Sequence, residues 1–238
     1  NVENKESSIN AVAEIWSSAN GLDWELETNT PGFSARIGHQ VIVHDSKLWL
    51  IGGRDETGSK NDVWSSSDGV SWNLIVEEAE FSKRYHHEAL SFNGRIWVIG
   101  GTFNSTPDGQ VWSSLDGVVW NHESNIPRRY KHRVIKYKDH IVVVGGSTGI
   151  SLSSSTALND VWASSDGINW TELTEDADFK SRFAHELFVF EGALYLLGGH
   201  DGSLGQFWKT DIWRTDDGAS WSLVQLIPSE LAQTSFSA

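Results

Sequence analysis

Four short apolar stretches recur along the chain, and each one ends at a pair of glycines. The stretches are 48–51, 96–99, 141–144 and 194–197, and they precede Gly52 and Gly53, Gly100 and Gly101, Gly145 and Gly146, and Gly198 and Gly199. Runs this short and this apolar predict strands that are covered on both faces. The glycines indicate places where neighbouring backbones approach closely.

The apolar stretches belong to a longer repeated unit. An arginine lies sixteen residues and a histidine thirteen residues before each first glycine: Arg36 and His39, Arg84 and His87, Arg129 and His132, Arg182 and His185. Two tryptophans spaced by eight residues follow each glycine pair, and Trp16 and Trp24 repeat this spacing without the upstream half. A period of 45 to 53 residues between glycine pairs predicts an array of supersecondary units.

Each unit contains signals for four strands and two tight turns. Asn93 and Gly94 lie between two strand-like segments, 89–92 and 96–99, and such a pair accepts the positive φ angles of a two-residue hairpin. A second turn signal recurs five times in register, at residues 20–21, 68–69, 116–117, 166–167 and 217–218. We predict type I′ turns at these five positions, with strands on both sides.

Units of four antiparallel strands in series predict an all-β fold, a β-propeller with four-stranded blades. Complete units lie at about 36–76, 84–124, 129–174 and 182–225, after a partial blade at 14–28 and before a tail at 226–238, within one domain of residues 1–238. Two arrangements stay open. We favour five blades, the fifth shared by the two termini, because bare half-blades leave open sheet edges. Otherwise the chain is a fragment of a six- or seven-bladed ring.

The pattern Arg-x-x-His, apolar strand, Gly-Gly, loop, Asn-Asp-Val-Trp, Asp-Gly and Trp resembles the kelch repeat, and it covers residues 36–225 four times. The resemblance implies a propeller whose loops present a surface to a protein or glycan partner. It also admits an enzyme similar to the bacterial kelch-type sialic acid mutarotases. The absence of cysteine excludes the crosslinked cofactor of galactose-oxidase-like kelch enzymes.

Composition narrows the possible partners. The net charge of −14 disfavours nucleic acid and anionic membranes, which need a basic surface. The longest apolar runs are about five residues, too short to span a bilayer. We expect no cofactor and no metal site. Acidic charge without cysteine suits a secreted or extracytoplasmic protein, and the polar start without methionine suggests a mature chain or part of a larger one.

In a four-stranded blade, the loop before the first strand and the loop between the second and third strands emerge on the same face. We call this face the mouth. It would gather Arg36, His39, Arg84, His87, Arg129, His132, Arg182 and His185 with the loop residues Arg54, Phe103, His200, Phe207 and Trp208. The arginines and histidines could form an anion-binding ring.

A structural interpretation competes with the anion-binding ring. Each arginine or histidine would then bond a backbone carbonyl or an acidic residue of a neighbouring unit. Recurrence in every unit favours the structural role, so the non-repeating loops are the better guide to a site. Trp208 is the clearest loop candidate, because it lies outside the tryptophan register.

Three functions are compatible with these residues. A non-catalytic binding module for a protein or glycan partner is favoured. The alternatives are a sugar-active enzyme and a structural component of a secreted or cell-surface assembly. Fold alone does not decide among them.

Overall fold

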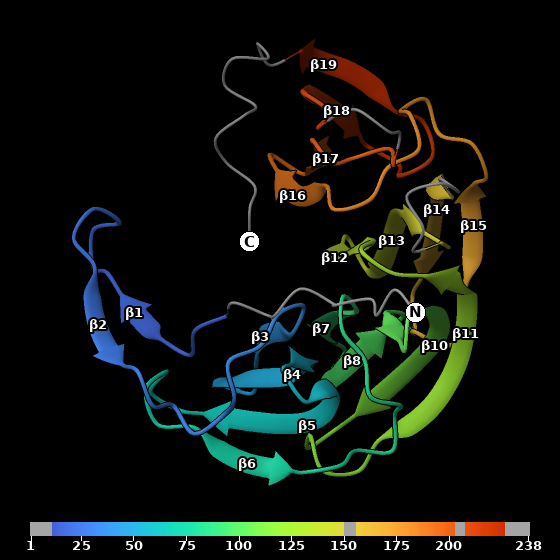
Figure 1. The fold of residues 1–238 in the computed structure, drawn as a ribbon. Coiled ribbons are helices and arrows are strands. Elements are labelled where there is room, and N and C mark those ends of the chain that lie inside the picture. The colour runs from blue at the N-terminus through green and yellow to red at the C-terminus, as the bar shows by residue number, and fades with distance from the viewer. Residues whose placement is uncertain (1–10, 150–155, 203–207, 227–238) are drawn as a thin grey trace, which may run out of the picture.

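The computed structural model describes residues 11–149, 156–202 and 208–226. Every regular element in these residues is a β-strand. The strands form five antiparallel sheets, which follow one another along an arc (Figure 1). No helix within the described ranges is long and apolar enough to cross a membrane.

The sheets follow the order of the chain. A two-stranded sheet, the half-blade, contains β1 (Ile15–Ser17) and β2 (Glu25–Thr28). Blade one contains β3 (Gln40–His44), β4 (Lys47–Asp55), β5 (Gly58–Ser66) and β6 (Asn73–Val76). Blade two contains β7 (Glu88–Phe92), β8 (Arg95–Ile99), β9 (Thr102–Phe103), β10 (Thr106–Ser114) and β11 (Asn121–Arg129). Blade three contains β12 (Arg133–Tyr137), β13 (His140–Ser147), β14 (Ala157–Ser164) and β15 (Thr171–Thr174). Blade four contains β16 (Glu186–Phe190), β17 (Ala193–Leu197), β18 (Asp211–Thr215) and β19 (Ser222–Leu226).

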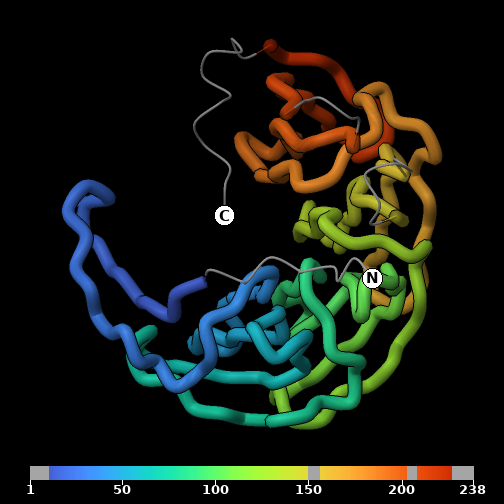
Figure 2. Tube along the Cα trace, viewed as in Figure 1, coloured from blue at the N-terminus to red at the C-terminus, as the bar shows by residue number. Residues whose placement is uncertain are grey.

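The first strands of the blades line the inside of the arc. β3 contacts β7, β7 contacts β12, and β12 contacts β16. The fourth strands β6, β11, β15 and β19 lie on the outside (Figures 1 and 2). This arrangement confirms the predicted all-β architecture of four-stranded antiparallel units in radial order.

The two ends of the arc do not pair with each other in the described residues. β1 and β2 bond only to each other among the described strands, and they lie at the opposite end of the arc from blade four (Figure 1). The tail from residue 227, on which a shared fifth blade depends, lies outside the described residues. Five blades, or six or seven, therefore stay predictions.

The first hairpin turn of each blade contains left-handed backbone, which confirms the turn predicted at Asn93 and Gly94 and extends it to the other three blades. Positive φ angles occur at Asp45 and Ser46, at Asn93 and Gly94, at Lys138, and at Glu191 and Gly192. This is the geometry that a two-residue hairpin requires.

The second turn was predicted wrongly as type I′. In blade one only Gly69 of the pair has a positive φ, and six residues separate β5 from β6. Asp68 Oδ1 instead accepts bonds from the Val70 and Ser71 amides, both at 2.8 Å, and Ser66 Oγ accepts the Gly69 amide at 2.8 Å. Side-chain oxygens therefore shape a wider loop than the Asp-Gly pair indicates.

The hydrophobic core lies between adjacent blades. Trp49, Ile51 and Val63 of blade one pack with Ile96 and Val98 of blade two. A second cluster joins blades two and three, and a third joins blades three and four. Each blade is thus stabilised by its neighbours, as expected for a repeat whose units cannot bury both faces alone.

A histidine forms the joint between successive blades. An added Cβ on Gly101 would lie 2.6 Å from His87 Cβ in the same blade, and one on Gly52 of the preceding blade would lie 3.0 Å from His87 Cε1. His132 stands in the same way between Gly146 and Gly100. The glycine pairs therefore leave the space that this histidine fills.

We predict that Gly101→Ala destabilises the protein more than Gly94→Ala. Both glycines have positive φ, +98° and +71°, but Gly94 has no atom within 4 Å of an added Cβ. Gly94→Ala should lower the free energy of unfolding by about 1–2 kcal/mol through backbone strain. Gly101→Ala should lower it by about 1–3 kcal/mol more, because the methyl group overlaps His87. Urea unfolding measures both, and equal losses would show that the joint relaxes freely.

Candidate binding site at the mouth of the arc

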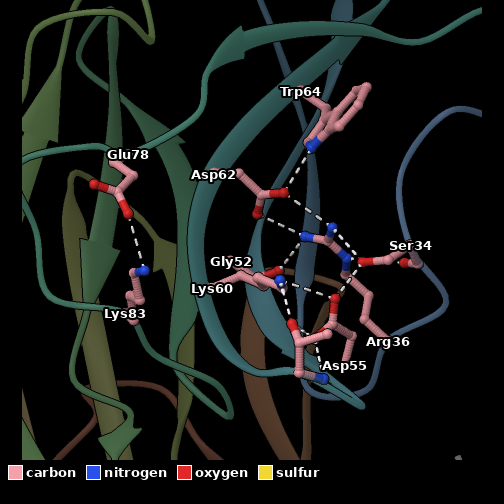
Figure 3. Close-up of polar contacts among 10 residues, drawn as sticks. Ser34, Arg36, Gly52, Asp55, Lys60, Asp62, Trp64, Glu78 and Lys83 are labelled. Atoms are coloured by element: carbon pink, nitrogen blue, oxygen red, sulfur yellow. Dashed lines mark hydrogen bonds and ion pairs between the residues drawn. The ribbon is translucent and has the colours of Figure 1, made fainter.

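Arg36 is held inside its own blade. Its Nη1 donates to the Gly52 carbonyl oxygen at 2.9 Å and to Asp62 Oδ1 at 2.6 Å, and its Nη2 donates to Asp62 Oδ2 at 2.9 Å. The indole Nε1 of Trp64 donates to the same carboxylate at 2.8 Å. Figure 3 shows this cluster, in which the guanidinium is enclosed by acceptors from its own blade.

The same contacts recur in blades three and four. Arg129 bonds the Gly145 carbonyl and Asp160, and Arg182 bonds the Gly198 carbonyl and Asp211. The acidic partner belongs to the same unit as its arginine, not to the neighbouring unit that the structural interpretation also allowed. These guanidinium groups tie the end of the second strand to the third strand.

Blade two departs from this pattern. Arg84 donates to Gln110 Oε1 at 3.0 Å and to Asp108 Oδ2 at 3.2 Å, so a single carboxylate contact replaces the bidentate pair. Burial lowers the pKa of Arg84 to about 10, although the charge of Asp108 acts in the opposite direction. The guanidinium therefore remains charged at neutral pH.

The repeated histidines are equally enclosed. His87, His132 and His185 have no exposed surface, and His39 at the start of the arc is half-buried. Neither ring nitrogen of the three buried histidines bonds another described residue. Burial holds their pKa values well below the ordinary value, with nearby arginine charges acting in the same direction. They are neutral packing groups.

The residues just before these histidines form a backbone belt around the inside of the mouth. Gly38, His86, Lys131 and Ala184 have φ angles of 61°, 52°, 51° and 52°. The His86 amide donates to the Gly38 carbonyl at 2.8 Å, the Lys131 amide to the His86 carbonyl at 3.1 Å, and the Ala184 amide to the Lys131 carbonyl at 2.8 Å. The belt binds four blades together, and its left-handed residues are the kind of strained backbone found at functional sites.

Aromatic rings and a cation surround the belt. Lys131 Nζ lies 5.9 Å from the centre of the Tyr130 ring and 5.8 Å from that of Phe183. The Tyr85 and His86 rings lie 5.0 Å apart between centres. Burial lowers the pKa of His86 to about 3, with the charges of Lys131 and Arg133 adding to the effect. We call Tyr85, Tyr130, Lys131 and Phe183 the rim.

The structure also places the loop residues predicted for the mouth. The Arg54 guanidinium carbon lies 5.5 Å from the centre of the Tyr85 ring, and Phe103 is 40% exposed on its loop. Trp208 is 45% exposed, and its ring centre lies 5.8 Å from that of His200. Phe207 lies outside the described residues.

A set of polar residues that the sequence analysis missed lies below the rim. Gln40, Glu88, Arg133 and Glu186 each follow a repeated histidine, and we call them the girdle. Arg133 donates to Glu88 Oε1 at 2.8 Å and also to Glu186, so it bridges the first strands of three blades. Gln40 donates to the His87 carbonyl at 3.0 Å. In the sequence, the girdle residues could be found only by their fixed position directly after each repeated histidine. That position is easy to overlook, because the residue type changes from blade to blade.

Belt and girdle line one cavity. Its volume is about 500 Å³, and its lining includes Lys131, Arg133, Glu88, Glu186 and Trp208. This size lies in the range of pockets that bind small molecules or short peptide segments. The sequence-predicted Arg36 and His39 touch it, whereas Arg84, Arg129 and Arg182 do not line it.

We predict a pH-dependent stability difference between the wild-type protein and Glu88→Gln. Burial raises the pKa of Glu88 to about 7 from 4.5, although the Arg133 charge opposes the rise. The folded protein therefore favours the neutral acid, and proton binding by Glu88 stabilises the folded state. This stabilisation is complete below pH 4.5 and is lost as the pH rises through 7. Relative to Glu88→Gln, the wild type should lose roughly 3 kcal/mol of unfolding free energy across that interval. Urea unfolding at pH 4.5, 6 and 7.5 checks this, and a difference that does not change with pH would contradict it.

Comparison with known proteins agrees with this geometry. The model of the KLHDC2/KLHL20/DRC7 Kelch-repeats domain matches residues 3–199, which is more than half of the 238 residues. No curated protein matches the chain. The repeated arginine, histidine and glycine pair, the four-stranded blades and the match to this domain agree with one another, and the chain belongs to the kelch-repeat family.

Proposed function

We propose that the chain is a protein-interaction module whose mouth receives a segment of a partner protein. The observation that carries this proposal is the continuous belt, which lines one cavity of about 500 Å³ together with the girdle and Trp208. Kelch repeats generally mediate protein interactions. A rigid scaffold with exposed loop residues above it is a common way to build a binding surface.

The chemistry of the mouth favours a partner segment with acidic and aromatic or apolar groups. Arg54 lies beside the ring of Tyr85 and Lys131 beside that of Phe183, and these two half-buried rings offer apolar area next to positive charge. Trp208 adds an exposed aromatic ring at the edge, and aromatic and arginine side chains contribute most to binding energy in many interfaces. The local positive charge contrasts with the net charge of −14 for the whole chain.

The geometry favours the sugar-active enzyme less. An acidic-sugar enzyme of the mutarotase kind would use accessible guanidinium groups, but the four repeated arginines are at most 6% exposed and bond acceptors in their own blades. A glycan ligand would rest mainly on stacking against Trp208. Secretion and a structural role in a larger assembly stay predictions.

Selection from a random peptide display library tests the proposed function. We expect the wild-type protein to select peptides, and Trp208→Ala to weaken their binding about tenfold or more while the melting temperature stays nearly unchanged. Leu115→Ala is the matched control, because Leu115 is an exposed apolar residue, 62% accessible, at the turns on the opposite face. Its binding should equal that of the wild type.

Two results would contradict the proposed site. Peptides that bind Trp208→Ala and wild type equally would place the interaction elsewhere. A large loss of thermal stability in Trp208→Ala without a change in binding would make this tryptophan a packing residue.

A further inference from the structure

One cation at the mouth has no partner of opposite charge among the described residues. Lys131 Nζ lies 5.9 Å from the centre of the Tyr130 ring and 5.8 Å from that of Phe183, but within these residues it forms no hydrogen bond or ion pair. An ammonium group has three donors, and burying it without an acceptor is costly. Burial accordingly lowers the pKa of Lys131 below its ordinary value. Since Lys131 lines the mouth cavity, an anion that enters the cavity can supply the missing acceptor.

The two arginines that line this cavity are already paired. Arg36 donates to both carboxylate oxygens of Asp62, at 2.6 and 2.9 Å. Arg133 donates to Glu88 at 2.8 Å and also to Glu186. One arginine therefore serves two carboxylates and has no charge left over for a further anion. Among the described lining residues, the unpaired ammonium group is the cation that remains for one.

The protonation of Glu88 sets the net charge inside the cavity. Two cations, Lys131 and Arg133, line it with two acidic side chains, Glu88 and Glu186. When Glu88 is protonated, the cations exceed the remaining carboxylate by one charge, and when it is ionised the charges sum to zero. One added carboxylate therefore leaves the cavity neutral if Glu88 holds its proton and negative if it does not. Unbalanced charge is unfavourable in poorly solvated surroundings.

The other side chains that face Glu88 from its own strand and from β3 are uncharged at pH 7. Burial lowers the pKa of His86 to about 3, and it holds those of His39 and His87 below the ordinary value. The amide of Gln40 lies 3.4 Å from Glu88 Oε1. Burial raises the pKa of Glu88 itself to about 7. Glu88 is therefore the group at this place whose charge changes as the pH rises through 7.

We propose that Lys131 binds a single carboxylate of the partner segment and that Glu88 takes up a proton from solvent when this carboxylate binds. The inference rests on the proposed function, because it concerns the segment that the mouth receives. The bound carboxylate accepts hydrogen bonds from the ammonium group, and its charge makes the ionised form of Glu88 less favourable still. A dianionic phosphate brings one charge more than the cavity balances, so it should bind no better than a carboxylate.

This coupling fixes the direction of the pH dependence. The free protein holds the Glu88 proton with a pKa of about 7, and a second carboxylate nearby raises this pKa in the complex. Affinity for the carboxylate is therefore complete below pH 7 and falls as the pH rises above 7. We expect the dissociation constant to increase about fivefold between pH 6 and pH 8.

Two capped tripeptides, acetyl-Phe-Asp-Phe-amide and acetyl-Phe-Asn-Phe-amide, test the inference because they differ by one charge. In 15N NMR titrations of the wild-type protein, the aspartyl peptide should shift the belt amides of His86, Lys131 and Ala184 saturably. The asparaginyl peptide should bind about tenfold more weakly at pH 6, and this difference should shrink at pH 8. A phosphoseryl peptide should bind no more tightly than the aspartyl peptide.

Three variants assign the effect to its residues. Lys131→Met should abolish the difference between the two peptides, because the ammonium group is lost. Lys136→Met is the matched control and should keep the difference, since Lys136 is an exposed lysine of the same blade that does not line the cavity. Glu88→Gln should remove the fivefold dependence on pH.

A further variant tests whether the chain's own carboxylates occupy Lys131. Glu3, Glu6 and Glu230 are the acidic side chains outside the described residues. A full-length protein with Glu3→Gln, Glu6→Gln and Glu230→Gln should bind the aspartyl peptide as the wild type does. Tighter binding by this triple variant would assign Lys131 to a carboxylate of the chain itself and overturn the proposal.

The proposal is also wrong if the two peptides bind equally, if neither binds, or if Glu88→Gln keeps the pH dependence of the wild type. The peptide comparison decides the question even if a variant fails to fold. Library peptides that depend on Trp208 but contain no acidic residue would leave the proposed function standing and overturn this inference alone.

Discussion

A neutral histidine ring packed between two pairs of glycines joins each blade to the preceding one. His87 rests on Gly101 of its own blade and reaches Gly52 of blade one, and both glycines lack the room for a Cβ. Because burial keeps the ring uncharged, the histidine contributes to the joint by packing, beside the backbone hydrogen bonds that also join the blades. The arc depends on this close approach, which sets how near adjacent first strands can lie.

Within each repeat, the residues that hold the blade together and the residues that line the mouth cavity occupy different positions. The arginine and the histidine are directed into the blade, and each arginine is bonded to a carbonyl at the end of the second strand. The residue before the histidine lies on the belt, and the residue after it lies in the girdle. Two neighbours of one packed residue therefore face the cavity, and they vary from blade to blade while the joint does not.

Burial gives the girdle its electrostatic character. Glu88 lies in a space where its charged form is disfavoured, and Arg133 is its near cation. The charges of Glu88 and Glu186 and their bonds to Arg133 raise the pKa of that guanidinium, although burial opposes them.

Much of the fold could be predicted from the sequence, because the repeated residues are those that backbone geometry requires. The four-stranded units follow from the apolar strands, the Gly-Gly ends and turns such as Asn93-Gly94. The second turn could not be predicted correctly, because Ser66 and Asp68 bond the loop amides and change its shape. A structural role for Arg36 follows from its recurrence, but its bonds to Gly52 and Asp62 depend on how β4 and β5 lie side by side.

The girdle could not be predicted for a different physical reason. Gln40, Glu88, Arg133 and Glu186 share no charge or size, so they form no recurring pattern. Only the three-dimensional arrangement brings them together, because the first strands meet on the inside of the arc.

The most direct test of whether packed neutral histidines join the blades is 15N NMR at pH 5.5, which reports the protonation state of each imidazole ring. At this pH an ordinary histidine is mostly protonated. The account predicts that His87, His132 and His185 remain neutral in the folded protein, because burial holds their pKa values well below the ordinary one. Protonated rings in a protein that is still folded would contradict it, since a charged imidazole cannot occupy a dry space between glycines.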